Sequence, residues 1–227
     1  MEDKSLYTAQ TARGGAESVL ATNRVLKNTY MLLSMTLLFS SFTAVASMAL
    51  NLSHGVGLMT SLVAIGLLWF VLPRTANSGK GIGVVFAITG LLGVGLGPML
   101  NYYLALPNGG SLVAQALGGT AIVFFGLSGY ALTTRKDFSF LAGFLVVGLI
   151  VAILAMVANL FMQIPALQLT ISAAVILIMS GFILFDTSRI INGGETNYVL
   201  ATIGLYISLY NIFVNMLHLL GALGGDD

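Results

Sequence analysis

The chain has 227 residues, of which 57% are hydrophobic and only 7% are charged, and its net charge is +1. Soluble domains carry roughly 25% charged residues, so this composition excludes a water-soluble surface and predicts an all-α, polytopic membrane protein. Cysteine is absent, which excludes a disulfide framework and a cysteine metal site. No basic stripe supports nucleic-acid binding. We expect neither a cofactor nor a bound metal.

Three segments are predicted from polarity. Residues 1–27 are polar and are expected to form a cytoplasmic N-terminal tail with little order, apart from a short surface helix near its end. Residues 28–222 form the transmembrane domain, and residues 223–227 form a short acidic C-terminal tail. A helix needs about 20 apolar residues to cross the hydrocarbon core. Seven runs are long enough to do so, near residues 28–50, 55–72, 82–106, 112–133, 139–162, 165–189 and 198–222.

The positive charges are distributed asymmetrically between these runs. All nine Lys and Arg residues lie in the tail or at the second, fourth and sixth gaps. Because positively charged loops stay in the cytoplasm, we expect the N-terminus to be cytoplasmic and the C-terminus to be periplasmic. The alternation also supports seven crossings, since six or eight would break it.

The third run contains Gly93 and Gly97 at G-x-x-x-G spacing. Small residues at this spacing let helix backbones approach closely in lipid. Packing inside one bundle is favoured over a dedicated dimer face, because such pairs are common in membrane helices.

Residues 126–129 (GLSG) match the G-x-S-G of rhomboid intramembrane proteases, which need a histidine base beside the serine. Ser128 is predicted near the cytoplasmic face, whereas His218 is predicted near the outer end of the last run. A packing role is therefore favoured for Ser128, with its hydroxyl bonded back to its own helix. The chain has no H-E-x-x-H zinc motif and no helix lysine for a retinal Schiff base, so we expect no enzyme and no rhodopsin.

The last run carries Ser208, Asn211, Asn215 and His218, whose spacing of 3, 4 and 3 places them on one helix face. Two interpretations remain open. These groups either form hydrogen bonds to neighbouring helices or line a polar pathway. Asn159, on the fifth run, is expected to meet the outer end of this face.

Asp186 lies at the cytoplasmic end of the sixth run. An ionisable residue in a membrane segment is costly and indicates function. One interpretation is an interfacial carboxylate paired with Arg189, one turn further on, with Arg74 as another candidate partner. The other is a proton-sensitive gate formed by Asp186, Arg189, Ser208 and Arg74.

Two segments resemble the Bax inhibitor family of seven-helix membrane proteins. They are residues 184–190 (LFDTSRI) and 205–213 (LYISLYNIF), and the loop at residues 135–140 (RKDFSF) adds to the likeness. The resemblance covers nearly the whole chain. It implies a role in calcium leak, in stress tolerance or, in bacteria, in control of the membrane protease FtsH.

One position departs from the calcium-leak members of that family, in which an aspartate of the last helix pairs with the aspartate of the sixth. Ser208 stands at that position, so Asp186 has no carboxylate with which to titrate as a coupled pair. With a serine at this position, the chain resembles the YccA-like branch of the family, whose members bind and restrain FtsH. Hairpin geometry adds a condition, because Asp186 and Ser208 face each other only if the turn extends to about Tyr198.

The chain is therefore interpreted as a multi-pass protein of the bacterial inner membrane that binds and restrains an FtsH-type protease within the lipid bilayer. The alternative is a pH-modulated calcium or cation leak gated near Asp186, with calcium or protons as partners. A packed cytoplasmic end with Asp186 bound to Arg189 favours the binding function. A continuous polar cavity that reaches Asp186 favours conduction.

Overall fold

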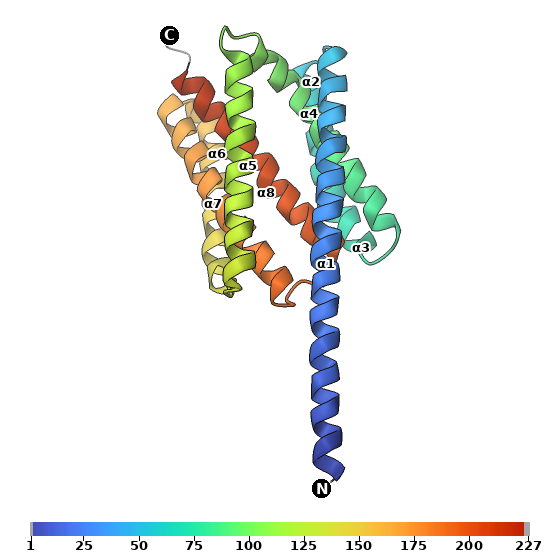
Figure 1. Cartoon of the computed structure of the whole chain (residues 1–227). Coiled ribbons are helices and arrows are strands. Elements are labelled where there is room, and N and C mark those ends of the chain that lie inside the picture. Colours follow the sequence, from blue (N-terminus) through green and yellow to red (C-terminus); the bar gives the residue numbers. More distant parts are fainter. Residues whose placement is uncertain (1, 225–227) are drawn as a thin grey trace.

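The computed structural model describes the backbone of residues 2–224 and the side chains of residues 20–224. This part of the chain is helical and contains no strand (Figure 1). Its elements in chain order are α1 (Glu2–Ala49), α2 (His54–Gly66), η1 (Leu67–Val71), α3 (Leu72–Thr75), α4 (Lys80–Leu104), α5 (Gly109–Thr134), η2 (Ser139–Leu141), α6 (Ala142–Met162), α7 (Pro165–Ile191) and α8 (Tyr198–Leu223).

Within the described residues, seven helical segments are long and apolar enough to cross a membrane, which confirms the predicted number. The first begins at Leu20, and the second comprises α2, η1 and α3 together. The backbone of the N-terminal tail is helical from Glu2, since α1 runs without a break to Ala49 and projects from one end of the bundle (Figure 1). The surface helix expected near the end of the tail is thus part of a longer helix. Residues 225–227 of the predicted acidic tail lie outside the described residues.

The second span contains a π-helical turn just before a proline. The backbone N–H of Leu72 bonds to the carbonyl of Leu67, five residues earlier, at the end of η1. Pro73 follows at the start of α3. Proline lacks an N–H and its ring displaces the preceding turn, and a π turn is a common way for a helix to absorb such a break.

Helix α8 is the centre of the bundle. It packs on α7, α5, α1 and α4, and it is the most buried of the seven spans. Its side chains Leu205, Tyr206, Ile212 and Leu217 are almost completely enclosed. In Figure 1, α8 crosses diagonally behind α1 and α5, with α6 and α7 on one side and α2 and α4 on the other. Helix α6 packs on α7 and is the least buried span.

The predicted glycine pair packs inside the bundle, against α1. A Cβ atom on Gly93 would lie 2.1 Å from Thr43 Oγ1 and 2.3 Å from the backbone oxygen of Ser40. A Cβ atom on Gly97 would lie 2.2 Å from Ser47 Oγ. Thr43 and Ser47 in turn donate hydrogen bonds to carbonyl groups of α4. The glycines therefore allow an α1–α4 contact close enough for hydroxyl groups of one helix to reach the backbone of the other.

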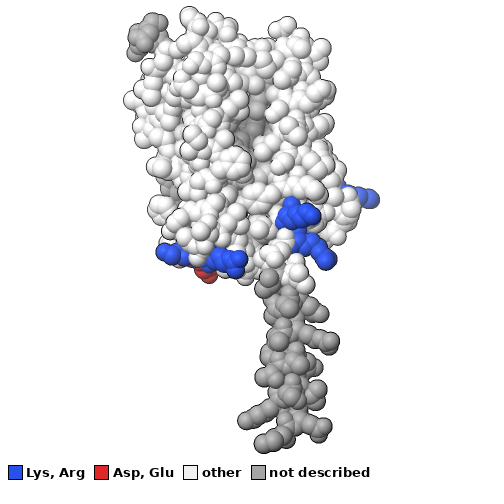
Figure 2. Space-filling model, viewed as in Figure 1, with Lys and Arg blue, Asp and Glu red and all other residues white. Residues whose placement is uncertain are grey.

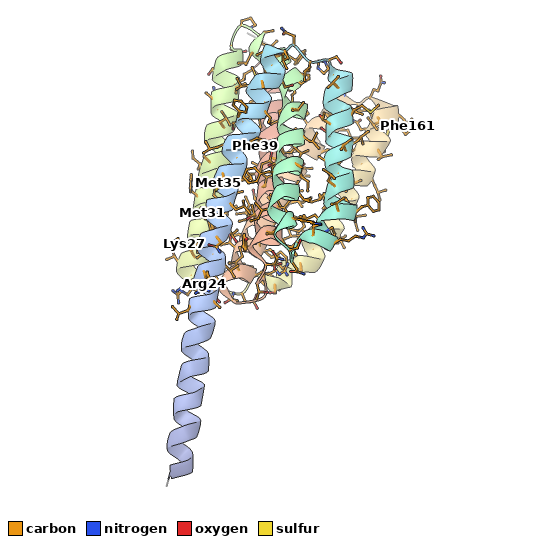
Figure 3. All side chains as sticks on the ribbon, turned by 90° about the vertical axis from the view of Figure 1, so that its right-hand side faces the viewer. Arg24, Lys27, Met31, Met35, Phe39 and Phe161 are labelled. Carbon is orange, nitrogen blue, oxygen red and sulfur yellow. The ribbon has the colours of Figure 1, made fainter. Side chains whose placement is uncertain are left out.

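The described Lys and Arg residues gather at one end of the bundle, which we call the basic end (Figure 2). This end holds the α3–α4, α5–η2 and α7–α8 connections. On α1 the change from charged to apolar takes one turn, because Arg24 and Lys27 are followed on the same side of the helix by Met31, Met35 and Phe39 (Figure 3). Lys27 and Met31 therefore mark the level at which the apolar part of the bundle begins.

Candidate functional site

The site centres on the turn between α7 and α8 at the basic end. Asn197 begins α8, and its side-chain oxygen accepts hydrogen bonds from the backbone N–H groups of Val199 (2.8 Å) and Leu200 (3.3 Å). This is the usual way in which an asparagine satisfies the free donors of a first helical turn. Its Nδ2 atom donates to the carbonyl of Ala76 (3.0 Å) and to Asn77 Oδ1 (2.7 Å). Asn197 thus also joins the turn to the α3–α4 connection.

Asp186 faces α8 at Gly204. A Cβ atom on Gly204 would lie 2.9 Å from Asp186 Oδ2, so the absent side chain leaves the space that the carboxylate occupies. Because α7 ends at Ile191 and α8 begins at Tyr198, the turn is centred near residue 195, and this register places Asp186 opposite Gly204. Ser208 lies one turn further along α8 and is buried. The condition under which Asp186 and Ser208 would face each other is therefore not met.

The expected ion pair between Asp186 and Arg189 is not formed. Arg189 instead bonds to Glu195 in the turn, with its Nη2 atom 3.3 Å from Glu195 Oε2. Arg74 is exposed and donates to the carbonyl of Phe70 on its own span. Among side chains of residues 20–224, Asp186 has neither a hydrogen bond nor an ion pair. The three charged residues Asp186, Arg189 and Arg74 therefore form no ion pair with one another.

Ser188 joins two of the segments that resemble one family. Its hydroxyl accepts a hydrogen bond from the backbone N–H of Phe138 (3.0 Å) and donates one to the carbonyl of Lys136 (3.0 Å). Asn192 Nδ2 also donates to it, at 3.2 Å. The side chain is fully enclosed. No role was predicted for Ser188, although its small polar side chain near the end of a helix, between Asp186 and Arg189, is consistent with such a link.

The loop held by Ser188 has its own local order. The hydroxyl and the backbone N–H of Ser139 both donate to Asp137 Oδ1, at 2.5 and 2.8 Å. These two hydrogen bonds hold the pKa of the Asp137 carboxyl below its usual range, because they favour its charged form. The Asp137 carboxylate therefore lies just before η2, at the start of the next helical segment, where a negative charge is favoured.

Ser128 contacts the same hairpin. Its Oγ atom lies 3.4 Å from Thr187 Oγ1, and both side chains are buried. The expectation that Ser128 bonds back to its own helix was wrong, because its partner belongs to α7. His218 lies at the other end of α8, where its ring centroid is 6.2 Å from that of Tyr103. The structure therefore keeps Ser128 apart from the histidine that a serine protease would require.

The polar residues of α8 bond along their own helix. Asn211 Nδ2 donates to the carbonyl of Ile207 (2.9 Å), and Asn215 Nδ2 donates to the carbonyl of Asn211 (2.8 Å). These two side chains therefore do not form the bonds to neighbouring helices that one of the two interpretations predicted. Asn159 does not extend this face as expected. It instead closes the α6–α7 turn, accepting from Ile164 N (3.0 Å) and donating to Gln168 Oε1 (3.1 Å).

The fold and this site define a class of protein. It is an all-α, multi-pass membrane protein in which a membrane-embedded carboxylate of the sixth span faces a glycine of the seventh. The sequence model described as "Inhibitor of apoptosis-promoting Bax1" matches residues 22–225. The chain belongs to this Bax inhibitor family.

Bacterial relatives match over almost their whole length. The chain is 56% identical over 209 residues to the "Modulator of FtsH protease YccA" of Escherichia coli K12, covering 92% of this chain and 94% of the relative. The same identity relates it to the "Inner membrane protein YccA" of E. coli O6:H1. It is 50% identical over 217 residues to an "Uncharacterized membrane protein" of Vibrio cholerae, covering 96% of this chain and 97% of the relative. The chain is a multi-pass inner-membrane protein, and these names point to a regulator rather than an enzyme.

Proposed function

We propose that this protein binds an FtsH-type membrane protease and restrains its action, without catalysing a reaction itself. The observation that carries the proposal is the 56% identity, over 92% of the chain, to a relative whose name describes it as a modulator of that protease. Because the match covers 92% of this chain, it extends over the bundle rather than over a single motif. We further propose that the basic end lies in the cytoplasm, by the charge asymmetry of the loops.

The shape of α1 supports the proposal. Its backbone continues from Leu20 back to Glu2 as a helix that leaves the bundle at the basic end (Figure 1). Eighteen helical residues extend roughly 27 Å, which is enough to reach a protein domain beside the membrane. A terminal segment that leaves its domain is the kind of element that a partner engages most easily.

The packing at the basic end supports binding more than conduction. The α7–α8 turn is tied to the α3–α4 connection through Asn197, and α7 is tied to the α5–η2 loop through Ser188. The structure nevertheless meets neither sequence criterion in full. Asp186 is not bound to Arg189, and neither of the two cavities described below is lined by Asp186.

Deletion of residues 2–19 tests the proposal. We expect the truncated protein to lose its effect on FtsH, so that a membrane substrate of the protease is degraded as fast as in cells that lack this protein. The measurement is the substrate half-life after synthesis is stopped. Membrane localisation and thermal unfolding of the truncated protein serve as checks on folding. An unchanged half-life in the presence of the truncated protein would remove the role given to α1, and absence of FtsH from a purified complex of the full chain would remove the function itself.

A second function, a calcium or cation leak controlled by protons at Asp186, is favoured by one observation. The Asp186 carboxylate lies between α7 and α8 opposite Gly204, without a described ion pair. A lone carboxylate in a membrane segment is a costly feature that usually has a function. Asp186→Asn removes the titrating group while nearly preserving its shape.

Flux from vesicles distinguishes the two functions. If the leak exists, vesicles containing the protein release calcium faster than empty vesicles, and Asp186→Asn makes that rate independent of pH. Deletion of residues 2–19 should leave such a flux unchanged, whereas Asp186→Asn should leave the effect on FtsH unchanged. Release no faster than from empty vesicles eliminates the leak.

A further inference from the structure

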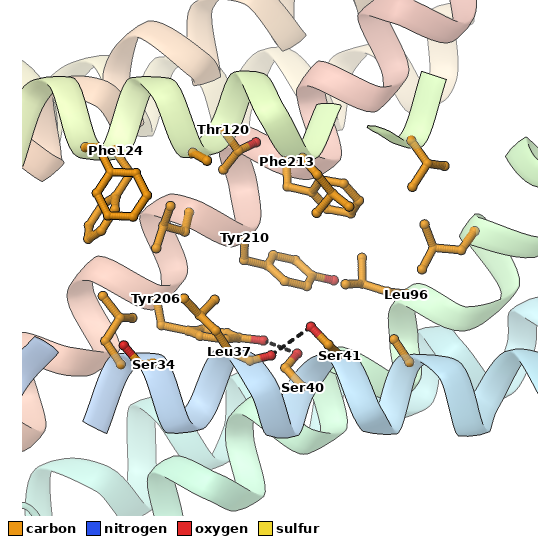
Figure 4. Close-up of a pocket in the computed structure, with 18 of the residues that line it drawn as sticks. Ser34, Leu37, Ser40, Ser41, Leu96, Thr120, Phe124, Tyr206, Tyr210 and Phe213 are labelled. Atoms are coloured by element: carbon orange, nitrogen blue, oxygen red, sulfur yellow. Dashed lines mark hydrogen bonds between the residues drawn. The ribbon is translucent and has the colours of Figure 1, made fainter. Parts of the chain in front are cut away.

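A cleft separates α1 from α5 on one side of the bundle, with α8 as its floor. Its larger part is a cavity of about 500 Å³. Leu37 on α1 and Leu117 and Ala121 on α5 form walls, and Tyr206 and Phe213 of α8 form the floor. Figure 4 shows Leu37, Tyr206 and Phe213 around this space, with Tyr210 projecting into it. Along α1 the cavity extends from Tyr30 to Val45, about 22 Å at 1.5 Å per residue.

The cavity lies at the depth of the lipid chains. Its first residue on α1, Tyr30, comes three residues after Lys27, where the apolar part of the bundle begins (Figure 3). The remaining length follows two membrane-spanning helices. An opening between them therefore faces hydrocarbon, and what enters the cavity from the side has the chemistry of a lipid chain.

The hydroxyl groups around the cavity are mostly satisfied within the protein. Ser40 Oγ lies 2.6 Å from the Tyr206 hydroxyl, which donates in turn to the carbonyl of Thr89 at 3.3 Å. Ser34 and Ser41 donate to carbonyl groups of their own helix. A ligand of this cavity thus gains apolar contact and needs few hydrogen bonds, as a hydrocarbon chain does.

The size of the cavity fits a lipid chain. Its 500 Å³ is within the range of sites for small organic ligands. Because this space is spread over a length of about 22 Å along α1, it suits a single extended chain.

A second, polar cavity of about 330 Å³ lies closer to the basic end. It lies between the same two helices, with Asn23 and Leu26 from α1, Arg135 from the end of α5 and Asn192 from the α7–α8 turn. Leu26 is one helical turn, about 6 Å, from Tyr30. The cleft therefore changes from apolar to polar and basic in the direction in which a phospholipid changes from its acyl chain to its phosphate.

Tyr30 and Phe124, whose ring centroids are 5.9 Å apart, line the larger cavity near its end toward the basic end. The Tyr30 hydroxyl is buried and has no hydrogen-bond partner within the described residues. An unpaired buried hydroxyl costs free energy, and this one lies at the level where the ester groups of a lipid would be.

From these features we propose that the α1–α5 cleft binds one membrane phospholipid, with an acyl chain in the larger cavity and the phosphate beside Arg135. The proposal does not depend on the function proposed above. Arg135 provides a guanidinium group suited to a phosphate, in a connection whose φ of 51° at this residue turns the chain away from α5.

Native mass spectrometry of the full chain, released from detergent, measures the lipid directly. We expect the wild-type protein to retain one phospholipid. Ala121→Trp places an indole ring in the cavity and should lower the retained fraction about tenfold by occupying the space of the chain. Ile122→Trp is the matched control, because Ile122 is the next residue of α5 and is 75% exposed on the outer face. It should retain lipid as the wild type does.

The headgroup part is tested with two added lipids, phosphatidylglycerol and diacylglycerol, which share acyl chains and differ in the phosphate. Wild-type protein should bind phosphatidylglycerol about fivefold more tightly than diacylglycerol. This ratio is what the small free energy of an exposed ion pair corresponds to. Arg135→Gln should remove the preference and leave the binding of diacylglycerol unchanged.

Equal retention of lipid by Ala121→Trp, Ile122→Trp and the wild type would overturn the proposal, because the lipid would then lie outside the cleft. Leu117→Trp repeats this comparison in case Ala121→Trp fails to fold. A photoreactive side chain at position 121 that forms adducts with a protein partner instead of a lipid would also overturn it.

Discussion

Replacing Gly93 with alanine tests the close contact between α1 and α4. The new Cβ atom would lie 2.3 Å from the backbone oxygen of Ser40 and 2.1 Å from Thr43 Oγ1. Thr43 could rotate, but a backbone oxygen cannot, so α1 must move by almost 1 Å to restore an ordinary contact. That movement would also strain the 2.6 Å hydrogen bond between Ser40 and Tyr206, which connects α1 to α8.

The expected loss follows from opposing terms. Alanine is favoured over glycine in a helix interior by about 1 kcal/mol. Overpacking of a close contact costs about 1–3 kcal/mol, and the upper end applies when backbone must move. Each interhelical hydrogen bond put at risk, from Thr43 to Gly90 and from Ser40 to Tyr206, is worth about 0.6 kcal/mol in a membrane. We therefore expect Gly93→Ala to lower the free energy of unfolding by about 2–3 kcal/mol.

Gly118→Ala is the matched control for this change. Gly118 also lies inside a membrane-spanning helix, α5, but a Cβ atom there would have no neighbour within 4 Å. This variant should be stabilised by up to about 1 kcal/mol through helix propensity alone. The assay is reversible unfolding in mixed micelles with increasing denaturing detergent. If the two variants unfold within about 0.5 kcal/mol of each other, the close approach of α1 and α4 does not control stability as reasoned here.

Three further predictions concern the α7–α8 hairpin. Asn197→Ala should lower the free energy of unfolding by about 2–3 kcal/mol, because it removes a helix cap and two hydrogen bonds, whereas Asn197→Ser keeps the cap and should lose about half as much. Equal losses would argue against the tie to the α3–α4 connection. Arg189→Gln should change stability by less than about 1 kcal/mol, because the Arg189–Glu195 pair is partly exposed and screened; a larger loss that persists in high salt would contradict this. Gly204→Val should cost about 1–3 kcal/mol by displacing Asp186, and a double-mutant cycle with Asp186→Ala should recover much of it, whereas additive losses would argue against the contact.

The number and positions of the spans could be predicted because they depend on local properties of the chain. Hydropathy decides which segments enter lipid, and the need to satisfy backbone groups there makes each of them a helix. Charges at the gaps likewise marked the end that Figure 2 shows as basic. Asp186 stood out for the same reason, since a carboxylate inside an apolar run is unusual wherever the run packs.

The partners of the site residues could not be predicted, because they depend on how two helices are aligned. A shift of one residue in a turn rotates the next helix by about 100°. The observed turn places Asp186 opposite Gly204 rather than Ser208. It also brings Glu195 to Arg189, so that Arg189 pairs with Glu195 and not with Asp186. Ser188 gained its role only when packing brought the loop after α5 against the end of α7.

The sequence by itself determined a seven-span helical membrane protein with a basic end and a candidate carboxylate, because hydrophobicity, charge and helix length act within each segment. Only the tertiary structure decided which groups meet and where the bundle stays open. The α1–α5 cleft is an example, since each of its walls is an ordinary apolar helix face. It exists because α1 and α5 both pack on α8 at positions that leave a space between them.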